Sequence, residues 1–280
     1  MEAATKKSLQ IFALKARKEA VTGIFCAKAG HPGGSLSICD VLSYLYNVEM
    51  NVDPANPRKA DRDRLVLSKG HAAPALYATL ALKGFFPVEA MKTLRKSDSF
   101  LQGHPNMDKV PGVDMSTGSL GQGISAAVGM ALGAKLDNDS YRVQVILGDG
   151  ELQEGQVWEA AMFAGNKNLS NLTAWVDNNN LQIDGTMEEV NAPYPIADKF
   201  KAFNWNTMEI DGHNFDEIEA AMQAAKACTD KPTAIIMHTV KGKGISFMEN
   251  KVNWHGSAPN EEQYNEAMAE LSAKLEELEA

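Results

Sequence analysis

The feature that most constrains the fold is an alternation of short apolar runs and longer helical segments in the second half of the chain. Three runs have the length and apolar character of buried strands: 142–147, 171–176 and 233–238. Helices are predicted between them at 154–168 and 215–228. Short strands separated by helices favour a parallel sheet that is covered on both faces. We therefore expect a doubly wound α/β fold with a mainly parallel sheet and helices on both faces.

The first half of the chain and its tail extend this pattern. A further strand is predicted at 64–68, and helices at 6–28, 35–47, 72–83, 88–96 and from about 123 to 136. Ser35 is expected to cap the helix 35–47, because a serine side chain accepts hydrogen bonds from the first N–H groups of a helix. The tail 260–280 carries apolar residues at every third or fourth position, which predicts an acidic helix packed on its own domain rather than a coiled coil. We expect residues 1–280 to form a single domain.

Composition excludes several classes of partner. The 280 residues are 44% hydrophobic and 22% charged, as in an ordinary globular chain. A net charge of −9 disfavours binding to a phosphate backbone, so no nucleic-acid partner is expected. No apolar run approaches the ~20 residues of a membrane span, and the first residues lack the apolar core of a signal peptide. Cys26, Cys39 and Cys228 have no metal-type spacing and are interpreted as reduced thiols. We expect a cytoplasmic protein with no membrane partner.

Polar segments follow two of the predicted strands at the place where α/β sheets bind ligands. Gly148-Asp149-Gly150 follows the strand 142–147, and an asparagine-rich segment, 177–185, follows the next strand. Ligands of open α/β sheets bind at the carboxyl ends of the strands. The helix 154–168 also points its positive end at this place, which favours phosphate groups.

The two segments together offer oxygen ligands for a metal ion. Mg²⁺ prefers about six oxygens, commonly one or two protein groups completed by phosphates and water. The Asp149 carboxylate, the Asn179 side chain and the Leu181 carbonyl could supply the protein ligands. Taken singly, the first segment is equally well explained as a turn with an Asp cap, and the second as a turn that closes a strand. Turns alone do not explain why the two segments occur as a pair.

Six further glycine- or histidine-bearing segments accompany this pair: Gly30-His31-Pro32-Gly33, Ser68-Lys69-Gly70-His71, Gly103-His104-Pro105, Thr117-Gly118-Ser119-Leu120-Gly121-Gln122-Gly123, Lys241-Gly242-Lys243-Gly244 and Trp254-His255-Gly256. Gly148-Asp149-Gly150 followed by Asn178-Asn179 resembles the diphosphate motif of thiamine diphosphate enzymes. The six other segments resemble transketolase motifs in transketolase order. The resemblance covers almost the whole chain.

The resemblance implies a set of cofactor contacts. The three oxygen ligands named above would hold Mg²⁺, for which Ca²⁺ or Mn²⁺ can substitute, and the metal would bridge the two phosphates of thiamine diphosphate. Gly150, His71 and Lys241 would contact the diphosphate. The backbones of Gly118 and Leu120 would contact the thiazolium and aminopyrimidine rings. A lysine also fits on physical grounds, because a buried diphosphate needs cations besides the metal.

Four histidines in glycine- or proline-bearing loops form the second part of the resemblance. Imidazole can accept a hydroxyl proton or hydrogen-bond an oxyanion at ordinary pH. By resemblance, His31 and His255 face the donor hydroxyl whose deprotonation cleaves the carbon–carbon bond, His255 also touches the cofactor, and His104 binds the terminal donor hydroxyl. His213 and His238 are interpreted as structural, the first as a turn and helix-entry residue and the second at a strand end.

The resemblance also implies a partner chain. In transketolases the glutamate that activates the aminopyrimidine lies in a second domain, which has no counterpart in this sequence. The chain is thus similar to the amino-terminal subunit of a split transketolase. It would work with a carboxy-terminal subunit in a heterotetramer of two copies of each chain. Glu154 has two open interpretations: a favourable charge in the first turn of a helix, or part of an acidic network across the subunit interface.

The implied reaction transfers a two-carbon ketol unit from a ketose phosphate to an aldose phosphate, as in the pentose phosphate pathway. Three alternatives remain: the α subunit of a 2-oxoacid dehydrogenase, a deoxyxylulose phosphate synthase, or a non-catalytic cofactor-binding module. His31, His104 and His255 argue against the first, because an oxoacid has no polyol for three histidines to bind.

Overall fold

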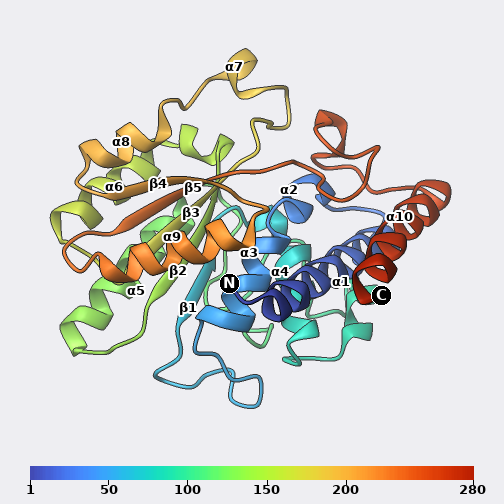
Figure 1. Ribbon diagram of the computed structural model, residues 1–280, viewed down its shortest axis with the longest axis horizontal. Helices are drawn as coiled ribbons and strands as arrows, with labels where there is room; N and C mark the ends of the chain where they lie inside the picture. The colour runs from blue at the N-terminus through green and yellow to red at the C-terminus, as the bar shows by residue number, and fades with distance from the viewer.

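The computed structural model describes residues 1–280 and contains a five-stranded sheet with helices on both sides (Figure 1). The strands are β1 (Arg64–Leu67), β2 (Val143–Gly148), β3 (Leu172–Asn178), β4 (Asn206–Asp211) and β5 (Thr233–His238). Their order across the sheet is β1-β2-β3-β5-β4, and every neighbouring pair is parallel. All five carboxyl ends therefore lie at one edge. The predicted doubly wound α/β class is confirmed.

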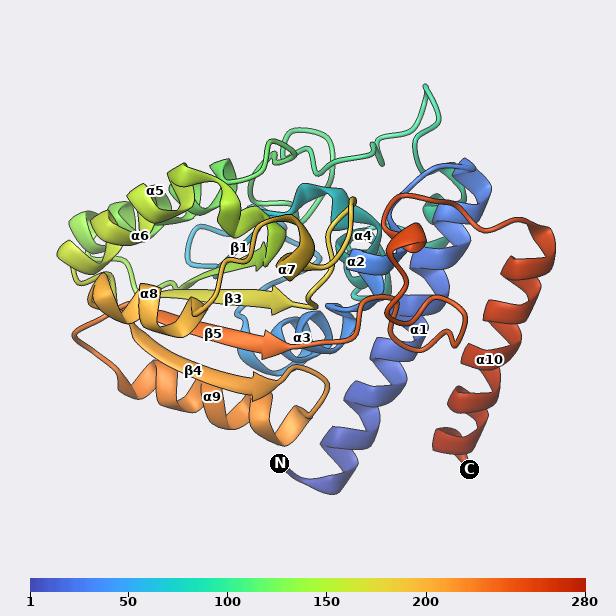
Figure 2. The same cartoon turned by 90° about the horizontal axis from the view of Figure 1, so that it is seen from above.

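Two layers of helices bury the two faces of the sheet (Figure 2). One layer contains α5 (Gln122–Asp137), α6 (Gly155–Asn166) and α8 (Ile196–Ala202). The other contains α3 (Cys39–Tyr44), α4 (Ala73–Leu82) and α9 (Phe215–Ala227), and α1 (Ala3–Ala27) packs on α3 and α4. Along β2, Val145 and Leu147 face the first layer and Ile146 the second, as the alternation of side chains in a strand requires. Both faces are apolar because both are covered.

The predicted helix 35–47 is wrong in its start and its continuity. A short helix α2 (Pro32–Leu36) precedes α3, and a π-helical turn (Leu45–Glu49) follows α3. Pro32 occupies the first helical position, where its missing N–H costs no hydrogen bond. Ser35 caps nothing, and its hydroxyl donates to the His31 carbonyl at 2.7 Å. The proline therefore marks the helix start that serine was expected to mark.

Other elements differ from the prediction or were not predicted. The segment 88–96 forms only a short 3-10 helix (Val88–Thr93), after which Leu94 and Arg95 lie in a turn and Arg95 has a positive φ of 61°. Strand β4, helix α8 and the short helix α7 (Met187–Val190) were missed. β4 lies at the sheet edge, where only one of its six residues is buried, so its sequence lacks the apolar run of a central strand.

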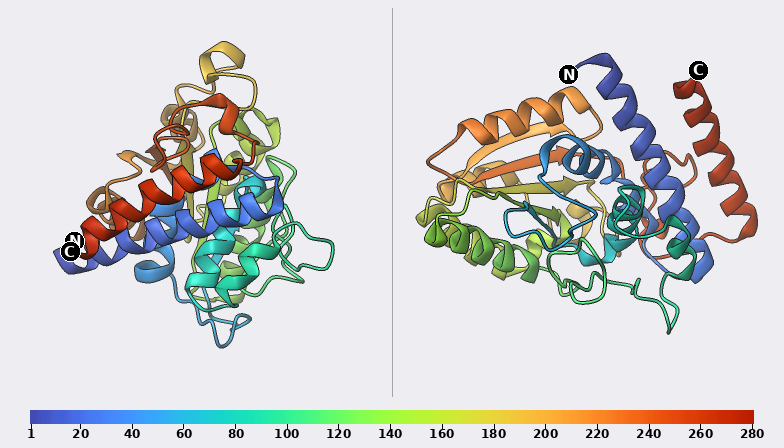
Figure 3. Two further views of the ribbon diagram at one scale, coloured as in Figure 1. Left: turned by 90° about the vertical axis from the view of Figure 1, so that its right-hand side faces the viewer. Right: turned by 90° about the horizontal axis from the view of Figure 1, so that it is seen from below.

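The tail forms α10 (Glu261–Glu279), which runs beside α1 (Figure 3). Ala267 and Leu271 of α10 pack with Val21 of α1 and with Ile245 and Met248. The tail helix thus packs on its own chain, as expected. Among all the helices, none combines the length and the apolar character that crossing a bilayer requires. That residues 1–280 are one domain stays a prediction.

Candidate functional site

A cavity of about 330 Å³ lies at the carboxyl ends of the strands. Lys69 follows β1, Asp149 follows β2, Asn179 follows β3 and Lys241 lies just beyond β5, and all four line this cavity. The structure therefore brings together most residues that the sequence had singled out: His31, His71, Gly118, Leu120, Asp149, Gly150, Glu154, Asn179, Leu181, Lys241 and His255. His104 is the one predicted site residue outside the lining.

The Asp149 carboxylate lies at the floor of the cavity with 2% of the residue exposed. Its Oδ1 accepts a hydrogen bond from the Gly150 N–H at 2.8 Å, and its Oδ2 accepts one from the Asn180 N–H at 2.6 Å. Burial, with the nearby charge of Asp177, raises the pKa of Asp149 to about 7. A cation placed beside this carboxylate would favour its ionised form.

The two other oxygens expected to bind a metal come from the turn after β3. The Asn179 Nδ2 donates to Asp177 Oδ2 at 2.8 Å, so the amide oxygen turns away from Asp177 and accepts from the Leu181 N–H at 3.1 Å. The Leu181 carbonyl accepts from the Lys241 Nζ at 2.6 Å. One carboxylate, one amide oxygen and one carbonyl oxygen form the kind of donor set that Mg²⁺ prefers. The structure contains no group of three His, Cys, Asp or Glu side chains suited to a metal such as zinc.

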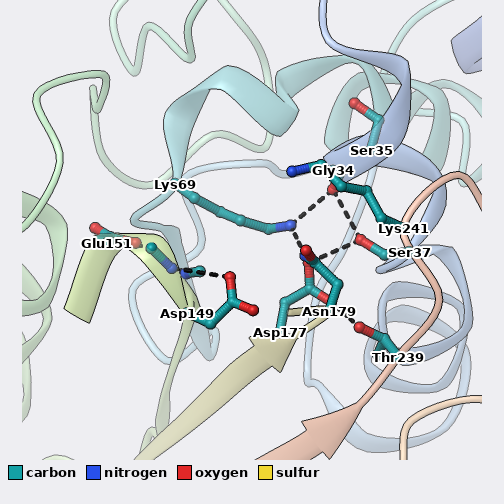
Figure 4. A network of polar contacts seen from close by, with 12 residues as sticks. Gly34, Ser35, Ser37, Lys69, Asp149, Glu151, Asp177, Asn179, Thr239 and Lys241 are labelled. Carbon is teal, nitrogen blue, oxygen red and sulfur yellow. Dashed lines mark hydrogen bonds and ion pairs between the residues drawn. The ribbon is translucent and has the colours of Figure 1, made fainter. Parts of the chain in front are cut away.

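A buried ionic network behind these residues was missed by the sequence analysis (Figure 4). The Lys69 Nζ lies 2.6 Å from Asp177 Oδ2 and 2.7 Å from the Gly34 carbonyl. Asp177 also accepts hydrogen bonds from the hydroxyls of Ser37 and Thr239. Burial alone would raise the pKa of Asp177, yet the Lys69 ammonium and these hydrogen bonds hold it below its usual range. The one available signal was a lysine directly after a buried strand, in the Ser68–His71 motif.

Three histidine rings meet on another wall of the cavity. The ring centroid of His31 lies 5.1 Å from that of His71 and 5.5 Å from that of His255, and the last two are 5.2 Å apart. Burial, reinforced by neighbouring cationic side chains, lowers the pKa of His31 to about 4, that of His255 to about 3, and that of His71 well below its usual value. The three imidazoles are therefore neutral at pH 7.

A family model described as the transketolase thiamine diphosphate binding domain matches residues 10–277. The chain belongs to the transketolase family. It is 53% identical to the 6-deoxy-6-sulfo-D-fructose transketolase subunit SqwG of Clostridium sp. (strain MSTE9), over 86% of this chain and 88% of that protein. It is 44% identical to one subunit of the apulose-4-phosphate transketolase of Phocaeicola vulgatus, over 98% and 97% of the two chains.

Among solved structures, the transketolase of Campylobacter jejuni superposes with a TM-score of 0.90 at 34% identity. The match covers 97% of this chain but only 43% of the Campylobacter chain. This transketolase-family chain therefore corresponds to less than half of that single-chain relative, whereas it matches the two subunit relatives over most of their length. The names of these relatives favour transketolase over the 2-oxoacid dehydrogenase and deoxyxylulose phosphate synthase alternatives.

In this transketolase-family site, the buried carboxylate before α6 is Glu151 rather than Glu154. Glu151 is 2% exposed and accepts from the N–H groups of Gly121 and Gly148, at 2.9 and 3.1 Å, and from the Ser68 hydroxyl. Burial raises its pKa. Glu154 precedes α6, lies exposed at the cavity edge and caps no N–H group of the helix. Glu151 could not be found from the sequence, because its partners come from three separate segments.

His104 lies at the rim, outside the cavity lining. A Cβ atom added to Gly118, whose φ is +155°, would come within 3.1 Å of the His104 ring, so the ring rests against that backbone. The Tyr77 hydroxyl donates to the His104 carbonyl at 2.8 Å and anchors the loop. The ring itself is exposed. Its expected contact with the far end of a donor sugar stays a prediction.

Proposed function

We propose that this chain is the cofactor-binding subunit of a two-chain transketolase, which moves a two-carbon ketol unit from a ketose phosphate to an aldose phosphate. One observation carries the proposal. A cation-binding oxygen set, a buried lysine and a cluster of neutral histidines face a single cavity at the carboxyl ends of the strands. That combination suits a metal-bound diphosphate next to a polyhydroxylated substrate.

The floor of the cavity would hold the diphosphate and its metal. Asp149, Asn179 and the Leu181 carbonyl would bind Mg²⁺, and Lys241 would turn from the Leu181 carbonyl towards a phosphate. His71 and Gly150, with the backbones of Gly118 and Leu120, would complete the cofactor contacts. Thiamine diphosphate, when bound, supplies a carbon nucleophile and an electron sink.

The histidines would handle the hydroxyl proton of the donor. The Lys241 ammonium lies 2.9 Å from His255 Nδ1, which must therefore be an acceptor, so the ring proton is on Nε2. His255 can then donate to a substrate oxygen. The buried Nδ1 of His31 has no hydrogen-bond partner. We propose that neutral His31 accepts the proton of the donor hydroxyl whose deprotonation cleaves the carbon–carbon bond. His104 would bind the hydroxyl at the far end of the donor.

A partner chain would supply the group that activates the cofactor. We propose a carboxy-terminal subunit that supplies the activating glutamate, in a heterotetramer of two copies of each chain. Glu154, exposed beside the cavity, would lie in that interface. Ile183 lines the same cavity with 61% of its surface exposed, which fits a region that a partner covers.

The donor sugar is the least determined part of the proposal. The two subunit relatives are named for different ketoses, a sulfofructose and apulose 4-phosphate, although both align with most of this chain, at 53% and 44% identity. We propose sugar phosphate substrates, including those of the pentose phosphate pathway, and a cytoplasmic enzyme with its three cysteines unpaired. Residues of the partner subunit would select among donors.

The test is a ketol-transfer assay with thiamine diphosphate and Mg²⁺. Xylulose 5-phosphate, apulose 4-phosphate and 6-deoxy-6-sulfofructose serve as donors and ribose 5-phosphate as acceptor, with this chain alone, the candidate partner alone and both together. Activity only in the mixture supports a split enzyme. Cofactor binding without transfer from any donor would favour the non-catalytic module instead.

A matched pair of variants tests the metal assignment. Asp149→Asn should weaken Mg²⁺-dependent binding of thiamine diphosphate about 100-fold or more, because it removes the only carboxylate ligand. Asp184→Asn, at an exposed position of the turn after β3, should bind normally. Calorimetric titration measures both. Equal affinities in the two variants would show that Asp149 does not hold the metal.

A further inference from the structure

The chain segment that carries Lys241 leaves the sheet one residue before it. The Thr239 N–H still donates to the Asn178 carbonyl of the neighbouring strand, at 3.2 Å. The next N–H, that of Val240, has no backbone acceptor and donates instead to the Nε2 of His213 at 2.9 Å. Lys241 follows directly. The last N–H group of the backbone before this lysine is therefore held by a histidine side chain, which lies just before helix α9.

His213 is itself held from behind by buried charges. Its Nδ1 lies 2.7 Å from Asp40 Oδ2, and Asp40 is bound through both oxygens by the Arg17 guanidinium. Arg17 also donates to the Leu36 carbonyl at 3.2 Å. The side chains of His213, Asp40 and Arg17 are 12%, 8% and 5% exposed. Because Nε2 accepts from Val240, the ring proton is on Nδ1 and points at Asp40.

The contacts from Arg17 through Asp40 and His213 end at Lys241, whose side chain has little conformational freedom. The Lys241 ammonium contacts the Leu181 carbonyl at 2.6 Å and His255 Nδ1 at 2.9 Å, and 2% of the residue is exposed. The backbone is held at its carbonyls as well, since the Val240 carbonyl accepts from the Lys243 N–H at 3.1 Å and the Lys241 carbonyl accepts from the Asn250 N–H at 2.9 Å. The Gly242 N–H then donates to the Gly33 carbonyl at 3.0 Å. A shift of the Val240 peptide between these supports would move the Lys241 Cα and withdraw the ammonium from the cavity.

We infer that His213 is a positioning residue for the Lys241 ammonium, acting through the Val240 peptide and backed by Asp40 and Arg17. The inference gives a function to a histidine that the sequence assigned to a turn. Its consequence for cofactor binding rests on the proposed function of Lys241. The geometric part, that His213 keeps Lys241 buried, is independent of any ligand.

Two substitutions at position 213 test the contacts of Nδ1 and Nε2 separately. In His213→Asn, the amide nitrogen can take the place of Nδ1 and donate to Asp40, but the side chain is too short to accept from the Val240 N–H. In Gln, the amide oxygen can take the place of Nε2 and accept from the Val240 N–H. If His213 only closed a turn, the two substitutions would have the same effect on Lys241. Arg17 and Asp40 are less suitable targets, because removing either leaves a buried charge without its partner.

The first measurement is acylation of Lys241 by acetic anhydride, followed by mass spectrometry, on the intact cofactor-free chain. The exposed Lys135 on α5 serves as the internal reference. We expect His213→Asn to acylate Lys241 at least five-fold faster relative to Lys135 than the wild type does. His213→Gln should stay within two-fold of the wild type. Equal Lys241 rates in all three proteins would overturn the inference.

The second measurement is the Kd for thiamine diphosphate with Mg²⁺, with urea unfolding of the same proteins as a check. We expect His213→Asn to weaken binding about ten-fold and His213→Gln less than three-fold, with unfolding midpoints that do not follow this order. Affinity loss that tracks the unfolding midpoint in both variants would overturn the positioning role. A wild-type chain that protects Lys241 but binds no cofactor would instead refute the proposed function and leave the acylation result to decide on His213.

Discussion

Replacing Lys69 with methionine tests the buried network behind the site. The side chains of Lys69 and Asp177 are 2% and 0% exposed, and Nζ lies 2.6 Å from Oδ2. Methionine keeps most of the volume but removes the ammonium. Breaking a buried ion pair by removing one partner costs about 3–5 kcal/mol, because the other charge stays buried without compensation. Asp177 keeps three hydrogen-bond donors, so the lower half of this range is expected.

Urea unfolding followed by circular dichroism measures this loss. With a slope of about 3 kcal/mol per M for a chain of this size, a loss of about 3–4 kcal/mol lowers the midpoint by about 1 M. Lys201→Met is the matched control, since Lys201 and Asp198 form an ion pair whose side chains are 60% and 68% exposed. Its loss should cost less than about 0.5 kcal/mol.

A double variant sharpens the result. Lys69→Met with Asp177→Asn removes both charges, and the Thr239 hydroxyl can accept from the new amide as well as it donates to the carboxylate. The double variant should therefore be less destabilised than the sum of the two single variants. If Lys69→Met destabilised the chain no more than Lys201→Met does, the buried pair would not hold the loops together, and our reasoning would be refuted.

Two further perturbations follow from packing and from charge. Gly33→Ala would place a Cβ 2.9 Å from the Trp254 carbonyl and 3.0 Å from the Lys241 Cγ, so we expect an approximately ten-fold loss of thiamine diphosphate affinity by calorimetry, and unchanged affinity would contradict it. Burial alone would raise the pKa of Asp40, but the Arg17 guanidinium holds it at about 2, below its usual 3.8. A lowered carboxyl pKa stabilises the fold above the unfolded value and loses that contribution as the pH falls. The stability gap between wild type and Asp40→Asn should therefore shrink by about 1 kcal/mol between pH 5 and pH 3 in urea titrations, and a constant gap would refute the assignment.

The elements that the sequence predicts best are those buried on both faces. β2, β3 and β5 are buried along almost their whole length because helices cover both sides of the sheet, and the mainly apolar runs that result can be recognised in the sequence. β4 pairs only with β5, and of its six residues only Ile210 is buried. An edge strand of this kind is set by its neighbour rather than by its own pattern, so periodicity cannot reveal it.

The same distinction applies to the site. The positions of Asp149 and Asn179 could be predicted, because parallel strands place the residues after their carboxyl ends at one edge. The role of Asp177 could not, since its donors lie on four segments that meet only in the folded chain. Neither the spacing of residues nor the composition predicts these tertiary contacts. His213 was assigned to a turn for the same reason, as its partners Asp40 and Val240 are distant in sequence.

Under the proposed function, the opposed charges of Lys241 and Asp149 would couple cofactor binding to proton uptake and release. Burial lowers the pKa of Lys241 from 10.5 to about 8, although Asp149 pulls it upward. At pH 8 a substantial fraction of the molecules then carries a neutral Lys241, and an anion bound beside it would raise this pKa and draw in part of a proton. Asp149, whose pKa burial raises to about 7, would release its proton to solvent when a metal binds. Asp149 is less protonated at pH 8 than at pH 7, so uptake gains on release as the pH rises.

The net proton change therefore depends on pH. As the pH falls from 8 to 7, the release from Asp149 increases and the uptake by Lys241 decreases, so the net change moves from uptake towards release. Titration of thiamine diphosphate with Mg²⁺ in buffers of different ionisation enthalpy measures the net change at both pH values. Lys241→Arg keeps the charge but cannot lose its proton, so it should abolish the uptake at pH 8 and retain the release at pH 7. The same proton change in wild type and Lys241→Arg at pH 8 would mean that Lys241 is already fully charged before the anion arrives.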